Sequence, residues 1–160
     1  MANRFWVGGS ANWDGTAGTK WSTSSGGAGG SAVPTLSDDV FFDANSGAVT
    51  VTVTSNGVCH VLNFNGFTGT FAGSSGLDIY GNLTLGSSMT LSYTGTITMN
   101  NNGTPSLITS NGKSFLSGFQ IGSSAFPNTY VAPFDDFIIN ANADIVFNYG
   151  TFDANNNNIT

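Results

Sequence analysis

Apolar and polar residues alternate in short runs along most of the chain after residue 48. In the clearest run, VTVTVT at residues 49–54, every second residue is apolar, which is the period of a β-strand with one buried face. Similar runs lie at residues 59–64, 69–71, 77–85, 89–93, 96–99, 106–109, 115–121, 136–139, 144–149 and 151–160. The segments between them are rich in Gly, Asn and Ser, which favour turns because Gly and Asn tolerate positive φ. The pattern predicts an all-β protein with almost no helix.

Strands this short fit two architectures, a right-handed parallel β-helix and an antiparallel β-sandwich. The β-helix is favoured because short strands suit the faces of a coil and because the turns carry Asn and Ser rather than charged residues. Similar units also recur along the chain. The segment TGTITMNNNG resembles YGTFDANNNN, and this alignment places Ile97 at the same point of its unit as Phe152, two or three coils further on. We therefore expect a parallel β-helix.

Runs of asparagine at residues 100–102 and 155–158 have two interpretations. In stacked coils, like residues lie above one another, so their side-chain amides can hydrogen-bond along the stack. Asn also tolerates the left-handed backbone conformation that tight corners need. The alternative is that both runs are mobile loop tips.

All three tryptophans, Trp6, Trp13 and Trp21, lie in the first 21 residues, before a Gly-Ser run at residues 22–32. A β-helix exposes an apolar cross-section at each end, which terminal residues must cover. We therefore expect residues 1–48 to form an aromatic N-terminal cap and residues 49–160 to form the coils of one continuous domain. Two alternatives are a platform on which sugar rings stack and a contact between subunits.

Charged residues make up only 8% of the chain, against about 25% in typical domains. The net charge of −6 reflects a shortage of cations, because only Arg4, Lys20 and Lys113 are basic. Without a basic patch, we expect no binding to nucleic acid and no insertion into membranes. The 39% hydrophobic content and thirteen phenylalanines indicate a folded chain rather than a disordered one.

Cys59 and His60 are the first candidates for chemistry, because a thiol beside an imidazole suggests a nucleophile and its base. Neighbours on a strand point to opposite faces, however, so these two cannot act on each other. We expect Cys59 in the core and His60 at the surface or a corner. A lone cysteine forms no internal disulfide, and the sequence predicts no cofactor.

Nine aspartates and no glutamate supply the acidic residues. Two adjacent pairs, Asp38–Asp39 and Asp135–Asp136, raise the possibility of glycoside hydrolysis, which uses two carboxylates. Other single carboxylates are Asp78, Asp144 and Asp153. Aspartates at strand entries more often accept backbone hydrogen bonds in turns, so we expect no enzymatic activity.

A calcium site is a further hypothesis, built on Asp38, Asp39 and Asp43. Oxygen ligands suit Ca²⁺, but the spacing differs from that of calcium-binding β-rolls. Turn capping by these aspartates is the preferred interpretation, and the sequence predicts no metal.

Several segments together resemble a known kind of module: NRFWVGGSANWDG, TKWSTSSGGAGGSAVPTLSDDVFFDANSG, ITSNGK, FDDF and GTFDANNNNIT. Similar modules occur in large repetitive proteins of bacteriophages and environmental bacteria. In them, a W-V-G-G…W-D…W-S opening leads through a Gly-Ser run to P-x-x-x-D-D-V-x-F-D, followed by Gly- and Thr-rich coils. These proteins are similar in style to adhesin and autotransporter passenger repeats, with parallel β-helices expected.

The resemblance implies a structural virion protein, either a tail-fibre or appendage component or a surface decoration that contacts the host. Its partners would be itself, as a homo-oligomer and by family resemblance a trimer, other virion proteins, and a host surface glycan. The alternative is a secreted bacterial adhesin module that binds surface glycans. The N-terminus lacks the cationic and apolar segments of a signal peptide, so we expect synthesis in the host cytoplasm and a location in the virion.

One departure from the resemblance concerns the last coil. In similar proteins the GTFDANNNNIT segment is followed by further coils, whereas this sequence stops at Thr160. Phe152 and Ile159 are therefore expected at an open end, which either further chain or another subunit covers.

Overall fold

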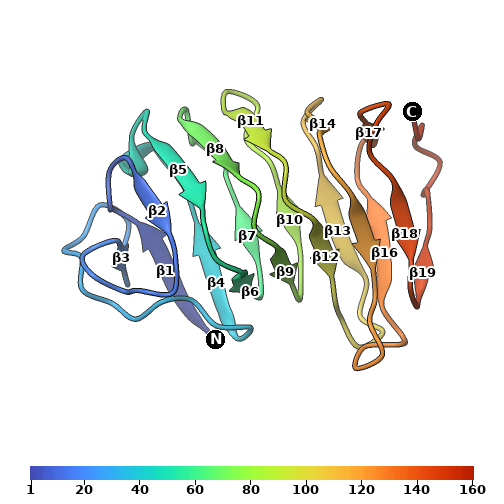
Figure 1. Ribbon diagram of the computed structural model, residues 1–160, viewed down its shortest axis with the longest axis horizontal. Coiled ribbons are helices and arrows are strands. Elements are labelled where there is room, and N and C mark those ends of the chain that lie inside the picture. Colours follow the sequence, from blue (N-terminus) through green and yellow to red (C-terminus); the bar gives the residue numbers. More distant parts are fainter.

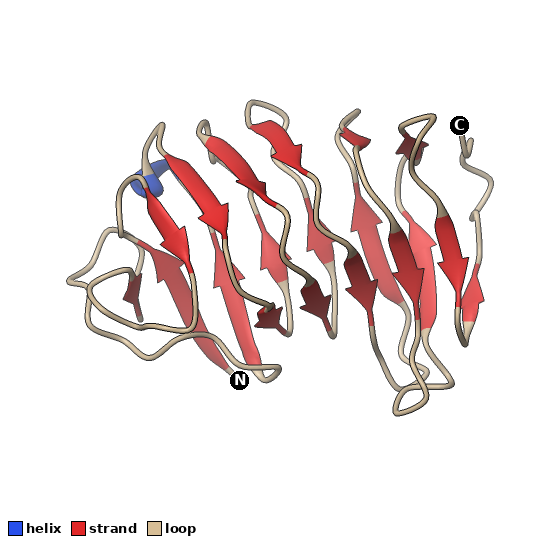
Figure 2. Ribbon diagram, viewed as in Figure 1, coloured by secondary structure: helices blue, strands red, loops and turns tan.

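The computed structural model describes residues 1–160 and is a right-handed parallel β-helix (Figure 1). In the view of Figure 1, strands at the back point up, strands at the front point down, and the chain advances from left to right. Five complete coils of three strands each follow one another, with strands of partial coils at both ends. Figure 2 shows that nearly all regular structure is strand; the one helical element is a single 3-10 turn, η1 (Ala44–Ser46).

Three stacks of strands form the faces of the helix. The first sheet contains β1 (Ala2–Trp6), β4 (Asp38–Phe41), β7 (Leu62–Asn63), β10 (Leu83–Thr84), β13 (Ser106–Thr109), β16 (Tyr130–Pro133) and β19 (Thr151–Phe152), with β3 (Trp21–Ser22) at its N-terminal edge. The second contains β2 (Ala11–Trp13), β5 (Thr50–Val53), β8 (Thr70–Gly73) and β11 (Thr90–Tyr93). The third contains β6 (Gly57–Cys59), β9 (Leu77–Ile79), β12 (Ile97–Met99), β15 (Phe119–Ile121) and β18 (Ile145–Phe147). A separate pair consists of β14 (Ser114–Phe115) and β17 (Ile138–Ile139).

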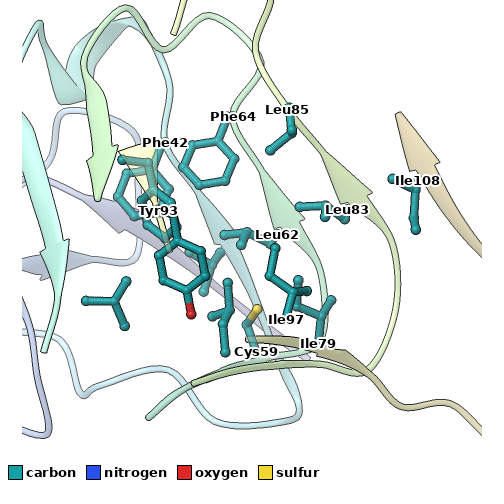
Figure 3. Close-up of a cluster of buried hydrophobic side chains, with 14 of the residues drawn as sticks. Phe42, Cys59, Leu62, Phe64, Ile79, Leu83, Leu85, Tyr93, Ile97 and Ile108 are labelled. Carbon is teal, nitrogen blue, oxygen red and sulfur yellow. The ribbon is translucent and has the colours of Figure 1, made fainter. Parts of the chain in front are cut away.

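All strand ladders are parallel except the pairing of β1 with β3, so the antiparallel sandwich is excluded. Alternation along each strand sends every second side chain inward, and parallel stacking places those side chains above one another. Val40, Leu62, Leu83 and Ile108 form one such column, and all four are fully buried. Figure 3 shows part of the resulting core, where Cys59 and Ile79 from the third sheet lie near Leu62 and Leu83.

The predicted aromatic cap is present at the N-terminal end. Trp6, Trp13 and Trp21 are 0–1% exposed, and Trp21 lies edge-on to both of the others. Trp6 also stacks on Phe42, which stacks in turn on Phe64 of the next coil at 4.8 Å. The cap is therefore continuous with the aromatic core of the coils, and parallel pairing already begins at β1, β2 and β4.

The alignment of the two similar units was wrong in register. Ile97 lies opposite Phe119, and Phe119 lies opposite Ile145, all in the third sheet. Phe152 instead pairs with Val131 in the first sheet. The residues that the two segments share reflect similar turns on different faces of the β-helix. They do not occupy equivalent positions in their coils. The run YVAP, which forms β16, was also missed, because it has no polar–apolar alternation and contains a proline.

The asparagine runs contribute to contacts between coils, but mostly through unlike partners rather than through an amide ladder. Asn157 donates to the carbonyl of Pro133, and the backbone N–H and the side-chain amide of Asn158 both donate to the carboxylate of Asp136. The only amide–amide contact between coils joins Asn148 to Gln120 at 3.5 Å. Positive φ at Asn155 and Asn156 agrees with the expected role of asparagine in tight corners.

Candidate functional site

A pocket of about 340 Å³ lies where the chain turns from the third sheet into the first. We call it the corner pocket. Its lining residues are His60, Val61, Tyr80, Gly81, Asn82, Asn101, Asn102, Thr104, Pro105 and Ser106. They come from three successive coils, so the pocket exists only because those coils are stacked.

Parallel register brings the two ring side chains of the pocket together. Cys59 pairs with Ile79, so the residues that follow them, His60 and Tyr80, occupy equivalent positions in adjacent coils. The backbone N–H of Tyr80 donates to the carbonyl of Cys59 at 3.0 Å, which continues the ladder into the corner. Both side chains are half-buried.

His60 is oriented by a carboxylate. Its Nδ1 lies 2.8 Å from Oδ1 of Asp39, which belongs to β4 in the preceding coil. An ionised carboxylate only accepts hydrogen bonds, so the proton of a neutral His60 ring lies on Nδ1 and its Nε2 is an acceptor. Nε2 lies against Gly81, where an added Cβ would be only 3.1 Å away. Glycine therefore keeps this side of the ring open.

The outer wall of the pocket is the loop at residues 100–105, which projects beyond the neighbouring turns at the lower edge of Figure 1. Asn101 fixes this loop with a buried amide. The amide donates to Ser106 Oγ at 2.9 Å and to the carbonyl of Tyr130 at 2.8 Å, and it accepts from the N–H groups of Gly103 and Tyr130. With all its hydrogen-bonding capacity satisfied, Asn101 ties the loop to the next coil.

A second projecting loop, residues 122–129, supports the pocket from the side. Its Phe126 contacts Tyr80 edge-on, with ring centroids 5.1 Å apart. Burial raises the pKa of the Tyr80 phenol, and the nearby carboxylate of Asp78 adds to this effect. The phenol hydroxyl therefore stays protonated and able to donate a hydrogen bond.

The three tryptophans lie away from this pocket, inside the N-terminal cap. Their rings are crossed at 86° and 75° and are buried, so they present no free indole face to a sugar ring or to another subunit. Trp6 Nε1 donates to the carbonyl of Gly9 at 2.9 Å, whereas Trp21 Nε1 is buried without a partner.

Asp38, Asp39 and Asp43 do not converge on a common point. Asp38 accepts from the N–H and hydroxyl of Thr35 and lies 3.7 Å from Arg4, Asp39 pairs with His60, and Asp43 caps the 3-10 turn η1. No group of three or more His, Cys, Asp or Glu side chains is placed to hold a metal ion. Each of these carboxylates therefore stabilises a different local structure.

The remaining candidate acids mostly accept hydrogen bonds from backbone N–H groups or from side chains of adjacent coils. Asp135 accepts from the N–H groups of Ser110 and Asn111, and Asp78 accepts from Asn56. Hydrogen bonds from Asn158 lower the pKa of Asp136, and a hydrogen bond from the Tyr130 hydroxyl lowers that of Asp153. Asp144 is exposed and its side chain forms no hydrogen bond. None of them lines the corner pocket.

Cys59 lies in the core and His60 points to the surface corner, as the alternation along the strand predicted. Burial raises the pKa of the Cys59 thiol well above its ordinary value, with smaller contributions from Asp39 and Asp78. The Asp39–His60 pair was not predicted from the sequence. Its members are 21 residues apart, about one coil, but only the register between coils brings them together.

Apolar side chains are exposed at the end of the last coil. Phe147 pairs with Ile121 and so points inward, yet it is 57% exposed, whereas Ile121 is fully buried beneath it. Tyr149 and Ile159 are also exposed, and Phe152 is half-buried beside Phe147. We call these four residues the C-terminal face. It lies at the opposite end of the β-helix from the aromatic cap.

The structure has no helix of the length and apolar character needed to cross a bilayer. No protein-family model, curated protein or solved structure matches the chain.

Proposed function

We propose that this protein is a structural component of a bacteriophage virion, as part of a tail fibre or appendage or as a surface decoration that contacts the host. The observation that carries the proposal is the stacking of short strands into one β-helix whose N-terminal end is closed by three buried indoles. A closed end stops the helix from recruiting further strands there, so growth and contact are confined to its sides and its other end.

Stacking also provides the mechanical property that such a role needs. Each coil is joined to the next by backbone hydrogen bonds and by columns of buried side chains. A coil cannot open without disrupting its neighbours, which favours stiffness and resistance to proteases. The absence of carboxylates from the lining of the corner pocket further favours a non-enzymatic role.

Homo-oligomerisation and contact with other virion proteins are part of the proposal. In the 160-residue chain, the C-terminal face exposes apolar side chains, including the inward-pointing Phe147, and contact with another subunit would remove them from water. The alternative of a secreted adhesin that binds glycans through its tryptophans has less support, because those side chains are buried.

Mass spectrometry of density-purified phage particles tests the proposed function. We expect peptides of this chain in the particle fraction at constant ratio to the major capsid protein through successive purification steps. Peptides confined to the soluble fraction of the lysate would refute a virion role. Immunogold labelling of the same particles then distinguishes a tail from a capsid location.

A further inference from the structure

We propose that the corner pocket binds an uncharged saccharide unit of a bacterial surface polysaccharide. The proposal deepens the host contact in the proposed function and rests on that function for the source of the saccharide. It moves the expected glycan contact from the buried tryptophans to the corner between the third and first sheets, at His60, Tyr80 and Asn82.

The pocket presents a hydrogen-bond acceptor and a donor whose polarities are fixed by the protein. In the neutral His60 ring, Nε2 accepts, because the Nδ1–H group faces the carboxylate of Asp39. Asn82 donates, because its Oδ1 already accepts from the N–H of Leu107 at 2.9 Å and its amide nitrogen has no partner in the protein. A sugar hydroxyl both donates and accepts, so adjacent hydroxyls match this pair.

Three further polar groups in the lining have no partner within the protein. They are the hydroxyls of Tyr80 and Thr104 and the side-chain amide of Asn102. Neutral groups of this kind bind hydroxyl groups without the large desolvation cost of a buried charge. The half-buried ring of Tyr80 adds an apolar surface for the C–H groups of a sugar.

Ligands of other classes fit the lining less well. A phosphate or sulfate would require Arg or Lys, and the lining contains neither. A metal ion would require several carboxylate, thiolate or imidazole ligands close together, and no group of three such side chains is placed to hold one. The pocket volume of about 340 Å³ falls at the lower end of the roughly 300–1,000 Å³ typical of small-molecule sites, which suits one or two sugar rings.

The pocket is also preorganised. Asn101 fixes the outer wall to the next coil, Phe126 supports Tyr80, and Gly81 leaves space beside His60. Groups held in place before binding lose little conformational entropy when a ligand arrives, which raises affinity for a small ligand.

The test is an array of purified bacterial O-antigen and capsular oligosaccharides, probed with the full chain and followed by calorimetry on the strongest hit. We expect binding to neutral oligosaccharides. In Asn82→Asp, Oδ1 still accepts from Leu107 but the donor is lost, so affinity should fall at least tenfold. Gly81→Ala places a methyl group against His60 and should weaken binding to a similar extent.

Asn140→Asp is the matched control. Oδ1 of Asn140 also accepts a backbone N–H, that of Asn142, and the residue is exposed outside the pocket. It should bind like the unmodified chain, and both Asn82→Asp and Asn140→Asp should keep the thermal unfolding profile of the unmodified chain. No binding on the array, or equal binding by Asn82→Asp and Asn140→Asp, would overturn the proposal. Particle mass spectrometry would still test the virion role independently.

Discussion

The indole of Trp6 meets the indole of Trp21 edge-on, with ring centroids 5.0 Å apart and an angle of 86° between the rings. Both rings are completely buried, yet their polar atoms differ. Nε1 of Trp6 donates to Gly9, whereas Nε1 of Trp21 has no partner. The cap therefore combines one satisfied indole with one that bears the cost of a buried, unpaired donor.

This difference predicts unequal effects of the same substitution. Trp6→Phe and Trp21→Phe both shrink a buried ring and leave a cavity, but only the first removes a hydrogen bond. We expect Trp6→Phe to lower the free energy of unfolding by about 1 kcal/mol more than Trp21→Phe. Urea unfolding followed by circular dichroism measures both. Equal losses, or a larger loss for Trp21→Phe, would contradict this account of the cap.

Close stacking of backbones predicts a strong effect at Gly73. This residue has φ +123°, and an added Cβ would lie 2.3 Å from the carbonyl oxygen of Val53 in the neighbouring coil. Gly73→Ala should therefore lower the free energy of unfolding by about 2 kcal/mol or more. Gly15→Ala is the control, because its added Cβ has no atom within 4 Å. Comparable urea midpoints for the two variants would show that the neighbouring coil can move away from position 73 with little loss in the free energy of unfolding.

Local patterns in the sequence were sufficient to predict the strands and the kind of fold. The VTVTVT run became β5 (Thr50–Val53), and its inward valines are buried, because alternation encodes which face of a strand is apolar. The cap was also predictable. The end of a β-helix exposes an apolar cross-section that must be covered, and the three tryptophans all lie near the N-terminal end of the chain, where they can cover it.

Register between coils was not predictable, and the corner pocket depends on it. The column of Val40, Leu62, Leu83 and Ile108 has spacings of 22, 21 and 25 residues, so no single repeat length aligns the coils. The extra residues lie in turns, where composition does not encode length. Without the register, nothing in the sequence places Asp39 beside His60.

Burial of Cys59 predicts an unreactive thiol. Its pKa is raised chiefly by burial, so little thiolate, the reactive form, is present in the folded protein at neutral pH. We expect modification by Ellman's reagent at pH 8 to be at least a hundredfold slower in the native chain than in urea. Rapid modification without urea would mean that the middle coils open easily. Because folding raises this pKa, the thiol's contribution to stability should be lost as pH rises above about 8.5.

Asp38 predicts a loss of stability in acid. Burial alone would raise its pKa, but hydrogen bonds from Thr35 and the charge of Arg4 outweigh this effect, so the pKa lies below its ordinary value. A lowered folded-state pKa gives stability that is present above about pH 3.9 and lost as pH falls further. Asp38→Asn should lower stability by about 1 kcal/mol at pH 7 and reduce the dependence on pH below 4.

Urea midpoints from pH 7 to pH 3 measure this effect. Asp144→Asn is the matched control, since Asp144 is exposed and its side chain accepts no hydrogen bond. It should follow the unmodified chain across the range. A steeper acid dependence in Asp38→Asn than in the unmodified chain would contradict the assigned role of Asp38.

The C-terminal face predicts self-association of the 160-residue chain through like ends. Phe147 points inward but is 57% exposed, and the opposite end of the β-helix is closed by the cap, so a head-to-tail filament has no second surface to use. Two copies that meet through this face form a closed, two-fold symmetric dimer. We therefore expect a concentration-dependent dimer in sedimentation velocity; a trimer would point to contacts along the sides of the coils instead.

Phe147→Lys and Phe134→Lys separate this contact from general surface hydrophobicity. Phe134 is 67% exposed, but it lies on the turn after β16 rather than on the C-terminal face. In Phe147→Lys, each copy would bring one positive charge into the interface, where both charges would be buried. The dissociation constant of the dimer should therefore rise at least tenfold. Lysine at position 134 should leave it unchanged. If both variants associate like the unmodified chain, the C-terminal face does not mediate self-association. If the unmodified chain is monomeric at all concentrations, burial of this face provides too little free energy to offset the entropy lost on association.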